Sequence, residues 1–233
     1  MPQSSSKKRQ PIHDLERVLN SLGTEVSVGK MHLWVWRGVT NALIERPNVR
    51  SVAPVFFGLT LRAHIDEAFL HLARLVEKRN DVLSLWTLLK CVDSNAAHFK
   101  GMKAEEVRRQ LLPAMKKSVR AIEERAAAVR NRRNKLLAHF TLDAAMDFEG
   151  VAKEFEVTVG EMVELYEEAG SVVNNILGPY QDALRLMEVV GWDDFKFAWD
   201  RIERGQEARR EELLARARSD IENLRAKIGK RGQ

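Results

Sequence analysis

Residues 105–138 read EEVRRQLLPAMKKSVRAIEERAAAVRNRRNKLLA and form the longest periodic stretch of the chain. Apolar residues recur in it at steps of three and four, which predicts a long helix with one buried face. The apolar stripe consists of Val107, Leu111, Leu112, Met115, Val119, Ile122 and Ala126. Pro113 lies inside the stretch and predicts a kink or a division, because proline lacks the amide hydrogen that a helix interior uses.

Helical patterns also precede this stretch. A first helix is predicted from about Ile12 to a stop at Pro47. We expect an interruption of this helix between Gly23 and Gly29. Residues 52–78 repeat large apolar side chains at steps of three and four, which predicts another helix with a broad buried face.

A further helix is predicted after the stretch. Thr158 and Glu161 have the spacing of a capping box, in which each side chain binds a free amide at the start of a helix. An acidic segment with an apolar stripe follows them. Gly178 and Pro179 predict a kink or a break in that helix.

Composition divides the chain into three predicted parts. Residues 1–10 are polar and basic and are expected to form a disordered tail. Residues 11–191 carry the helical patterns and predict one helical domain. Residues 192–233 are rich in charge and predict a C-terminal helix, in which a coiled-coil spacing from Leu214 to Ile228 spans barely more than two heptads. The expected architecture is an all-α bundle with a charged helical arm.

Composition also narrows the class of protein. The chain has 233 residues, 45% of them hydrophobic, which is enough for one sizeable core. Its single cysteine, Cys91, excludes an intrachain disulfide and a cysteine-pair zinc site, and we expect a small buried thiol. No apolar run approaches the roughly 20 residues of a membrane span, and none follows the basic N-terminus. We therefore expect a cytoplasmic protein with no membrane partner.

Positive charge gathers at the end of the periodic stretch. The net charge of +5 is by itself a weak sign of an anionic partner. Its distribution is more informative, because residues 101–140 hold eleven Lys and Arg against four acids, whereas residues 141–191 hold two against eleven. Residues 130–140, Arg-Asn-Arg-Arg-Asn-Lys-Leu-Leu-Ala-His-Phe, combine four of these cations with one histidine. We call these residues the Arg-His motif and take them as the candidate site.

Helical spacing brings several of these cations near His139. An α-helix advances about 100° per residue, so Arg132 and Lys135, seven and four positions earlier, share the face of the histidine. Arg133, six positions earlier, is offset by roughly 120°. It converges on the histidine if the helix bends near Ala138. Both arginines therefore stay open as its partners.

A histidine near arginines suits the cleavage of RNA. Histidine has an unperturbed pKa of about 6.5, so it can take a proton from a 2′-hydroxyl or give one to a leaving 5′-oxygen. Arginine binds two phosphate oxygens and stabilises the charge that grows on them. This chemistry requires no metal or other cofactor. The plain alternative is a solvated, charged helix end in which His139 caps the last carbonyls.

The sequence of the motif resembles a known family signature. Residues 133–139, Arg-Asn-Lys-Leu-Leu-Ala-His, resemble the signature of the HEPN superfamily, an arginine followed at once by a polar residue and closed by a histidine. Residues 70–78 and 83–89 look like the AbiU-type branch, which is associated with bacterial abortive infection. The similarity covers roughly residues 28–177. It implies an all-α HEPN-like bundle, commonly a homodimer with two facing motifs, and often a metal-independent endoribonuclease.

The resemblance implies roles for three residues of the motif. Arg133 would contact the phosphate, Asn134 would orient the pair, and His139 would be the acid–base group. One toxin branch of the superfamily has a tyrosine two positions after the histidine. Thr141 stands at that position here, which argues against that branch.

The other cations of the motif are candidates for binding RNA. Helical geometry adds Arg132 and Lys135 as contacts to the RNA backbone, with Arg130 at the edge of the site. Either Arg132 or Arg133 could be the catalytic arginine, and the sequence does not separate them.

Three functions are consistent with these features. The first is an endoribonuclease, acting as a toxin or phage-defence effector, that cleaves RNA at a composite Arg/His site across a homodimer interface. An antitoxin or regulatory protein would be a further partner. The second is a non-catalytic HEPN-like module that binds RNA or protein through the same basic face. The third and weakest is a coiled-coil adaptor that acts through residues 214–228.

Two pairs on the helix predicted at residues 52–78 have competing interpretations. His64 and His71 lie two turns apart, too far to share one metal ion without further ligands, so we expect no metal site. Arg62 and Asp66 are four residues apart and predict a surface ion pair. Alternatively, one of them orients Arg133.

Overall fold

Helices make up the regular structure of the described chain. The computed structural model describes residues 14–46, 53–138, 153, 156–185 and 192–229. All regular elements within these ranges are helical, which confirms the predicted all-α fold. The predicted tail at residues 1–10 lies outside the described residues.

The chain divides into two compact units that are not continuous in sequence. They comprise residues 1–37 with 59–189, and residues 38–58 with 190–233. The domain boundary predicted after residue 191 stays a prediction.

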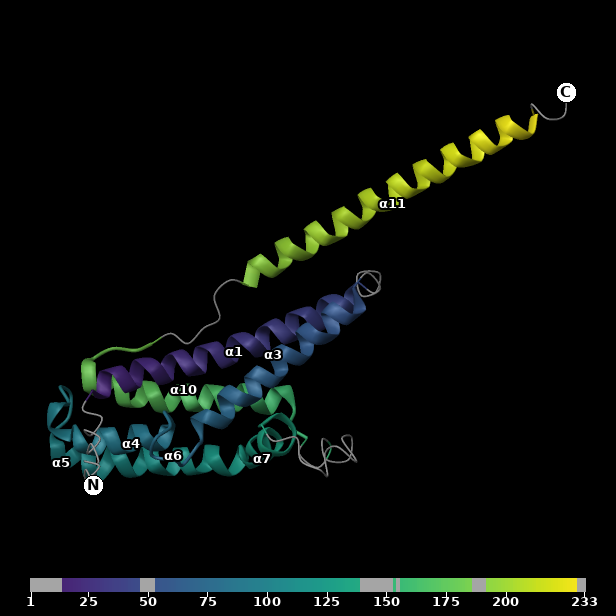
Figure 1. Ribbon diagram of the computed structural model, residues 1–233. Coiled ribbons are helices and arrows are strands. Elements are labelled where there is room, and N and C mark those ends of the chain that lie inside the picture. Colours follow the sequence, from purple (N-terminus) through teal and green to yellow (C-terminus); the bar gives the residue numbers. More distant parts are fainter. Residues whose placement is uncertain (1–13, 47–52, 139–152, 154–155, 186–191, 230–233) are drawn as a thin grey trace, which may run out of the picture. The chain divides into compact units, whose positions relative to one another are not determined.

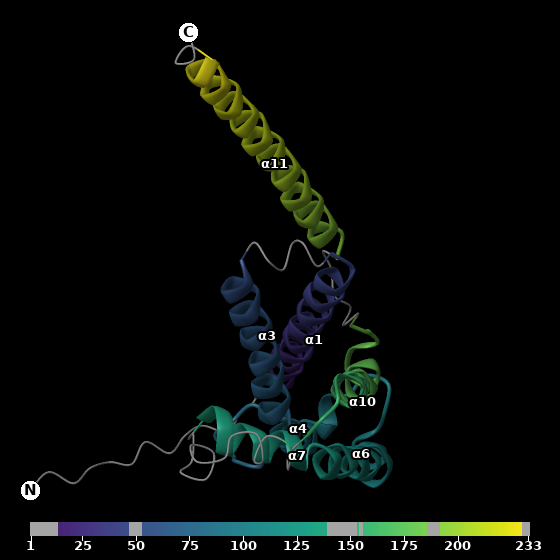
Figure 2. The same cartoon turned by 90° about the vertical axis from the view of Figure 1, so that its right-hand side faces the viewer.

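The first unit contains most of the helices (Figure 1). In chain order they are α1 (Leu15–Glu45), α3 (Pro54–Leu75), α4 (Leu85–Ser94), η1 (Ala96–His98), α5 (Ala104–Glu106), η2 (Val107–Leu111), α6 (Leu112–Arg125), α7 (Ala127–Arg132), η3 (Arg133–Ala138) and α10 (Val159–Gln181). The end of α1 and the start of α3 belong to the second unit. Within the first unit α6 packs against α4 and α10, and Figure 2 views α6 and α10 nearly end-on.

The core of the first unit lies between these helices. Leu72 of α3, Leu88 of α4, Val119 of α6 and Tyr166 of α10 are all fully buried. The hydroxyl of Tyr166 donates a hydrogen bond to the carbonyl oxygen of Ala68 at 2.6 Å, so its polar end is satisfied inside the core. The apolar stripes of the sequence therefore meet in one core.

The first helix is longer and more regular than predicted. α1 runs without interruption from Leu15 to Glu45, so the predicted interruption between Gly23 and Gly29 is wrong. Gly29 lies against the ring of Tyr166, and a Cβ atom on this residue would overlap that ring. Glycine here permits the close approach of α10, and this packing offsets its helix cost of about 1 kcal/mol relative to alanine.

The long periodic stretch is divided into shorter helices. Pro113 is the second residue of α6, directly after the π-helical η2, which confirms the predicted division. Leu112, the first residue of α6, donates its amide to the carbonyl of Val107, an i to i−5 bond of the π-helix, and Pro113 follows it without an amide hydrogen of its own. A second division falls at Ala126, between α6 and α7. The Arg-His motif begins in α7 and continues into the π-helical η3.

α10 begins at the predicted capping box. The amide of Glu161 donates to Thr158 Oγ1 at 3.1 Å, and the amide of Thr158 donates to Glu161 Oε2 at 2.7 Å. These two bonds confirm the prediction. The helix continues through Gly178 and Pro179 and ends at Gln181.

The second unit joins the end of α1 and the start of α3 to α11 (Trp192–Gly229). The rings of Phe57 and Trp199 stack with 5.4 Å between their centroids. Arg46 pairs with Asp200 at 3.5 Å and with Glu203 at 3.2 Å. Apolar stacking and ion pairing therefore anchor the beginning of α11.

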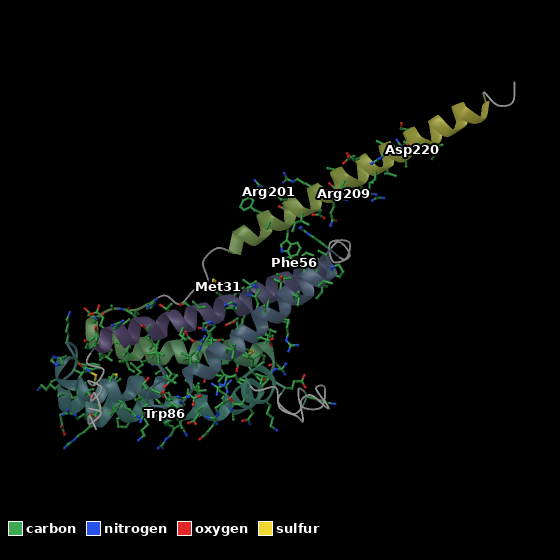
Figure 3. All side chains as sticks on the ribbon, in the orientation of Figure 1. Met31, Phe56, Trp86, Arg201, Arg209 and Asp220 are labelled. Atoms are coloured by element: carbon green, nitrogen blue, oxygen red, sulfur yellow. The ribbon has the colours of Figure 1, made fainter. Side chains whose placement is uncertain are left out.

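Residues 201–221 of α11 carry mainly exposed side chains, many of them charged. Arg201, Arg209 and Asp220 mark successive parts of this helix in Figure 3. Leu214 and Ile221, from the coiled-coil spacing, are 49% and 52% exposed. Among the helices described for this chain, none has the length and apolar character needed to cross a membrane.

Candidate functional site

The Arg-His motif is bound by the segment that follows α3. That helix ends at Leu75, and Glu77 and Lys78 lie in the connection to α4. Glu77 pairs with Arg133 of η3, while Lys78 pairs with Glu123 of α6. Two consecutive residues thus hold this connection against α6 and against the start of η3.

Two neighbours fix the orientation of Arg133. Its Nη1 and Nη2 atoms both donate to Glu77 Oε2 at 3.1 Å. Its Nε and Nη2 atoms donate to Asn134 Oδ1 at 2.9 and 2.7 Å. The four bonds engage four of the five guanidinium N–H groups and leave one on Nη1. Because the side chains of Arg133 and Glu77 are only 20% and 18% exposed, the guanidinium is held in a partly buried position.

A second carboxylate organises the preceding turn. Glu123 is buried, and its Oε1 accepts hydrogen bonds from Lys78 Nζ at 2.7 Å and Arg130 Nη1 at 3.2 Å. Burial alone would raise the pKa of the Glu123 carboxyl, but the hydrogen bonds from Lys78 and Arg130 outweigh it and lower the pKa. Glu123 is therefore ionised at neutral pH and holds two cations in fixed places.

Arg132 has a more apolar environment. Its guanidinium carbon lies 4.9 Å from the ring centroid of Phe69, in a cation–π contact. Burial lowers the pKa of Arg132, with a smaller opposing effect from Asp66. Because arginine stays protonated in proteins, a positive charge persists over this ring. Two arginines adjacent in sequence thus have different surroundings.

The backbone geometry changes at the motif. η3 is π-helical from Arg133 to Ala138. A π-helix bonds residue i to residue i+5, so its side chains advance by less than the 100° of an α-helix. The α-helical spacing that places Arg132 and Lys135 beside His139 therefore does not hold through this segment. His139 lies outside the described residues, and its pairing with either arginine stays a prediction.

The predicted pair on α3 is present. Arg62 Nε donates to Asp66 Oδ2 at 2.6 Å, which confirms the ion pair. The described carboxylate bound to Arg133 is that of Glu77 instead.

Three histidines form a separate cluster between α1 and α3. The Nδ1 atoms of His32 and His64 lie 2.9 Å apart, and the His32 ring stacks on that of His71 at 5.6 Å between centroids. His71 Nδ1 is 2.9 Å from Glu25 Oε1, which also pairs with Arg74 at 2.7 Å. Burial lowers the pKa of His32 and of His64, which favours neutral rings that donate and accept one hydrogen bond.

Neither a metal-binding cluster nor an exposed thiol is found among the described residues. Within the described ranges, no three or more His, Cys, Asp or Glu side chains are grouped so as to hold a metal ion. Cys91 is buried in α4, and burial raises the pKa of its thiol. The prediction of a small buried thiol is confirmed.

The chain matches a known protein family. A family model described as HEPN_AbiU2, AbiU2, matches residues 12–210. The chain belongs to the AbiU2 family. This membership confirms the HEPN-type resemblance and extends it on both sides of residues 28–177. The comparisons with curated proteins and with solved structures find no significant match.

Sequence reasoning missed three residues that contact the cations of the Arg-His motif. Glu77, Glu123 and Phe69 were not singled out, although each contacts a cation of the motif. Phe69 has only the pattern of a core residue, and Glu123 has only the pattern of a charged helix face. Glu77 stands 56 positions before Arg133, so only the packing of the fold brings it to the guanidinium.

Proposed function

We propose that this AbiU2 chain is a metal-independent endoribonuclease that acts in abortive infection, as a toxin or phage-defence effector. A ribose 2′-hydroxyl attacks the adjacent phosphorus, the bond to the 5′-oxygen breaks, and a 2′,3′-cyclic phosphate remains. Arg133 binds the phosphate, Asn134 orients Arg133, and His139 transfers the proton. Two chains in a homodimer bring two Arg-His motifs to one cleft.

The orientation of Arg133 supports this function best. Glu77 and Asn134 bind the guanidinium from two sides and leave one Nη1 hydrogen for another acceptor. A donor already in place requires little reorganisation when charge develops on a phosphate oxygen. The π-helical turn adds support, since such turns occur frequently at functional sites.

The other cations of the motif are proposed to bind the RNA backbone. Arg130 is held by Glu123, and Arg132 lies over the Phe69 ring, so both present their charge from restrained positions. Lys135 is partly buried in η3. Arg132 stays the second candidate for the catalytic arginine.

Incubation of the purified protein with transfer and messenger RNA in EDTA tests the proposal. We expect cleavage products with 2′,3′-cyclic phosphate ends, and a loss of cleavage in His139→Ala and in Arg133→Ala. Arg132→Ala should lose less activity if Arg133 is the catalytic arginine. Absence of cleavage by the unmodified chain, or equal cleavage by His139→Ala, would sink the proposal.

A non-catalytic module that binds RNA or protein is the alternative. The observation in its favour is that four N–H groups of Arg133 already bind within the chain, as in an arginine that only stabilises a fold. This alternative predicts salt-sensitive RNA binding without turnover. It also predicts that His139→Ala leaves RNA affinity unchanged.

A further inference from the structure

Two neighbouring hollows border α6 in the first unit. The first has a volume of about 490 Å³ and is lined by α6 alone, including Lys116 and Lys117. The second has a volume of about 490 Å³ and extends from α6 to Trp86 of α4. Arg120 and Glu124 line both hollows. We call the two together the α6 groove.

The cations of the first hollow do not pair with carboxylates of the described structure. Lys116, Lys117 and Arg120 are exposed, and none of them makes an ion pair or hydrogen bond within the described structure. Arg125, at the end of the same helix, instead pairs with two carboxylates of α10. The first hollow is lined by these three exposed cations and one acid, Glu124. The second hollow adds Lys78 and Arg130 with one further acid, Glu123. The groove is therefore suited to an anion.

An aromatic ring borders the second hollow. Trp86 is partly exposed, and Lys78 Nζ lies 5.5 Å from its ring centroid. Trp86 is labelled on the first unit in Figure 3. Its Nε1 is buried without a hydrogen-bond partner in the described structure, so hydrogen bonding does not account for a tryptophan here. The flat ring beside a hollow does offer a stacking surface.

We propose that the α6 groove binds a single-stranded segment of the RNA substrate. The phosphates bind Lys116, Lys117 and Arg120, and one base stacks on Trp86 beside Lys78, which stays paired with Glu123. The identity of the ligand as RNA rests on the proposed ribonuclease function. The groove thereby becomes a second contact area for the RNA, which adjoins the Arg-His motif at Arg130.

The ion pairs connect this groove to the motif. Arg130 lines the second hollow and binds Glu123, which also binds Lys78. The residue before Lys78 is Glu77, which holds Arg133. A strand that occupies the second hollow therefore contacts Lys78, the neighbour in sequence of the residue that holds the proposed catalytic arginine.

Single-stranded RNA fits this groove better than other anions. Unpaired bases can stack on an aromatic side chain, whereas bases in a duplex are already stacked on one another. A free phosphate or an acidic peptide would bind the cations but has no group that requires the indole ring. Regularly spaced phosphates also match cations that recur along one helix.

A binding assay with an uncleavable RNA tests the groove independently of catalysis. The probe is a fluorescein-labelled, fully 2′-O-methylated oligouridylate of about 12 nucleotides, followed by anisotropy with the full-length chain. Lys116→Gln, Lys117→Gln and Arg120→Gln are combined in one groove variant. The matched control combines Arg204→Gln, Arg210→Gln and Arg216→Gln, which removes the same charge from exposed positions of α11.

We expect the groove variant to lose at least tenfold in affinity while the α11 variant keeps most of it. The slope of log affinity against log salt should fall by roughly 2 in the groove variant, because each lost contact to a single strand removes about 0.7. Trp86→Leu should weaken binding about tenfold without changing this slope. A change of slope reports lost phosphate contacts, which a merely structural defect would not mimic.

Three results would overturn the inference. They are unchanged affinity and slope in the groove variant, an equal loss in the α11 variant, and competition by polyglutamate as strong as that by unlabelled probe. Failure of the proposed function gives a different result. If the chain binds the probe through the groove but cleaves no unmodified RNA, the groove inference stands and the proposed nuclease function is refuted. If the unmodified chain cleaves RNA and the groove variant binds the probe with normal affinity, the groove inference is refuted and the proposed nuclease function stands.

Discussion

Arg130 and Arg133 bind carboxylates that are 10% and 18% exposed, whereas Lys116 and Lys117, earlier in the same helical segment, have no carboxylate partner in the described structure. Removal of Arg133 leaves the shielded carboxylate of Glu77 without its cation, and removal of Arg130 leaves buried Glu123 with Lys78 alone. Both losses are costly. Removal of an exposed lysine leaves nothing behind. Stability and ligand binding should therefore separate along one segment, and the following variants test that separation.

Arg133→Ala should have the largest effect. The proposed phosphate contact is lost, so we expect cleavage to fall by roughly 10² to 10³. The Glu77 carboxylate also loses its partner, which should lower the free energy of unfolding by about 1–3 kcal/mol. Single-turnover cleavage and urea denaturation measure the two effects. If Arg133→Ala cleaves normally and Arg132→Ala does not, the catalytic role belongs to Arg132.

Glu77→Gln should have a smaller effect of the same kind. Glutamine keeps an acceptor near Arg133 but removes the charge, so the guanidinium is positioned less firmly. We expect about a tenfold loss in kcat, little change in KM, and a loss of about 1–2 kcal/mol in the free energy of unfolding. The matched control is Glu105→Gln, because the pair between Glu105 and Arg109 is exposed. Its removal should cost less than about 0.5 kcal/mol.

Equal losses in kcat from Glu77→Gln and Glu105→Gln would contradict a positioning role for Glu77. A rise in KM with unchanged kcat would also contradict it, because such a result indicates weaker binding of the ground state instead of poorer orientation in the transition state.

Glu123→Gln should change how the free energy of unfolding depends on pH. The pKa of Glu123 is lowered in the folded chain, so in acid the unfolded state binds more protons and stability rises with pH. The contribution of Glu123 is thus present at neutral pH and is lost as the pH falls below about 4.3 toward the folded pKa. The midpoint temperature of thermal unfolding should vary less between neutral and acidic pH in Glu123→Gln than in the unmodified chain. An unchanged pH dependence would show that the ion pairs of Glu123 do not stabilise the fold.

The success of sequence reasoning depends on whether an interaction is local. The apolar stripe through Val119 and the capping box at Thr158 were predicted, because each depends on residues a few positions apart. The role of Gly29 was missed, since it depends on a ring 137 positions later. Glu77 was missed for the same reason. The π-helical turn from Arg133 to Ala138 also has no simple signature in the sequence, so the α-helical period was assumed across it.

Lys117→Gln should have the smallest effect on folding. The side chain is exposed and makes no ion pair in the described residues, so the free energy of unfolding should change by no more than about 0.5 kcal/mol. Arg130→Gln removes a cation from buried Glu123 and should cost about 1–3 kcal/mol. Both variants should nevertheless reduce the salt dependence of RNA binding by a similar amount, because each removes one proposed phosphate contact. Urea denaturation and salt titration of the same two proteins measure both quantities. If Lys117→Gln destabilises the chain as much as Arg130→Gln, positive charge has one structural role along the whole segment, and the separation of stability from binding is lost.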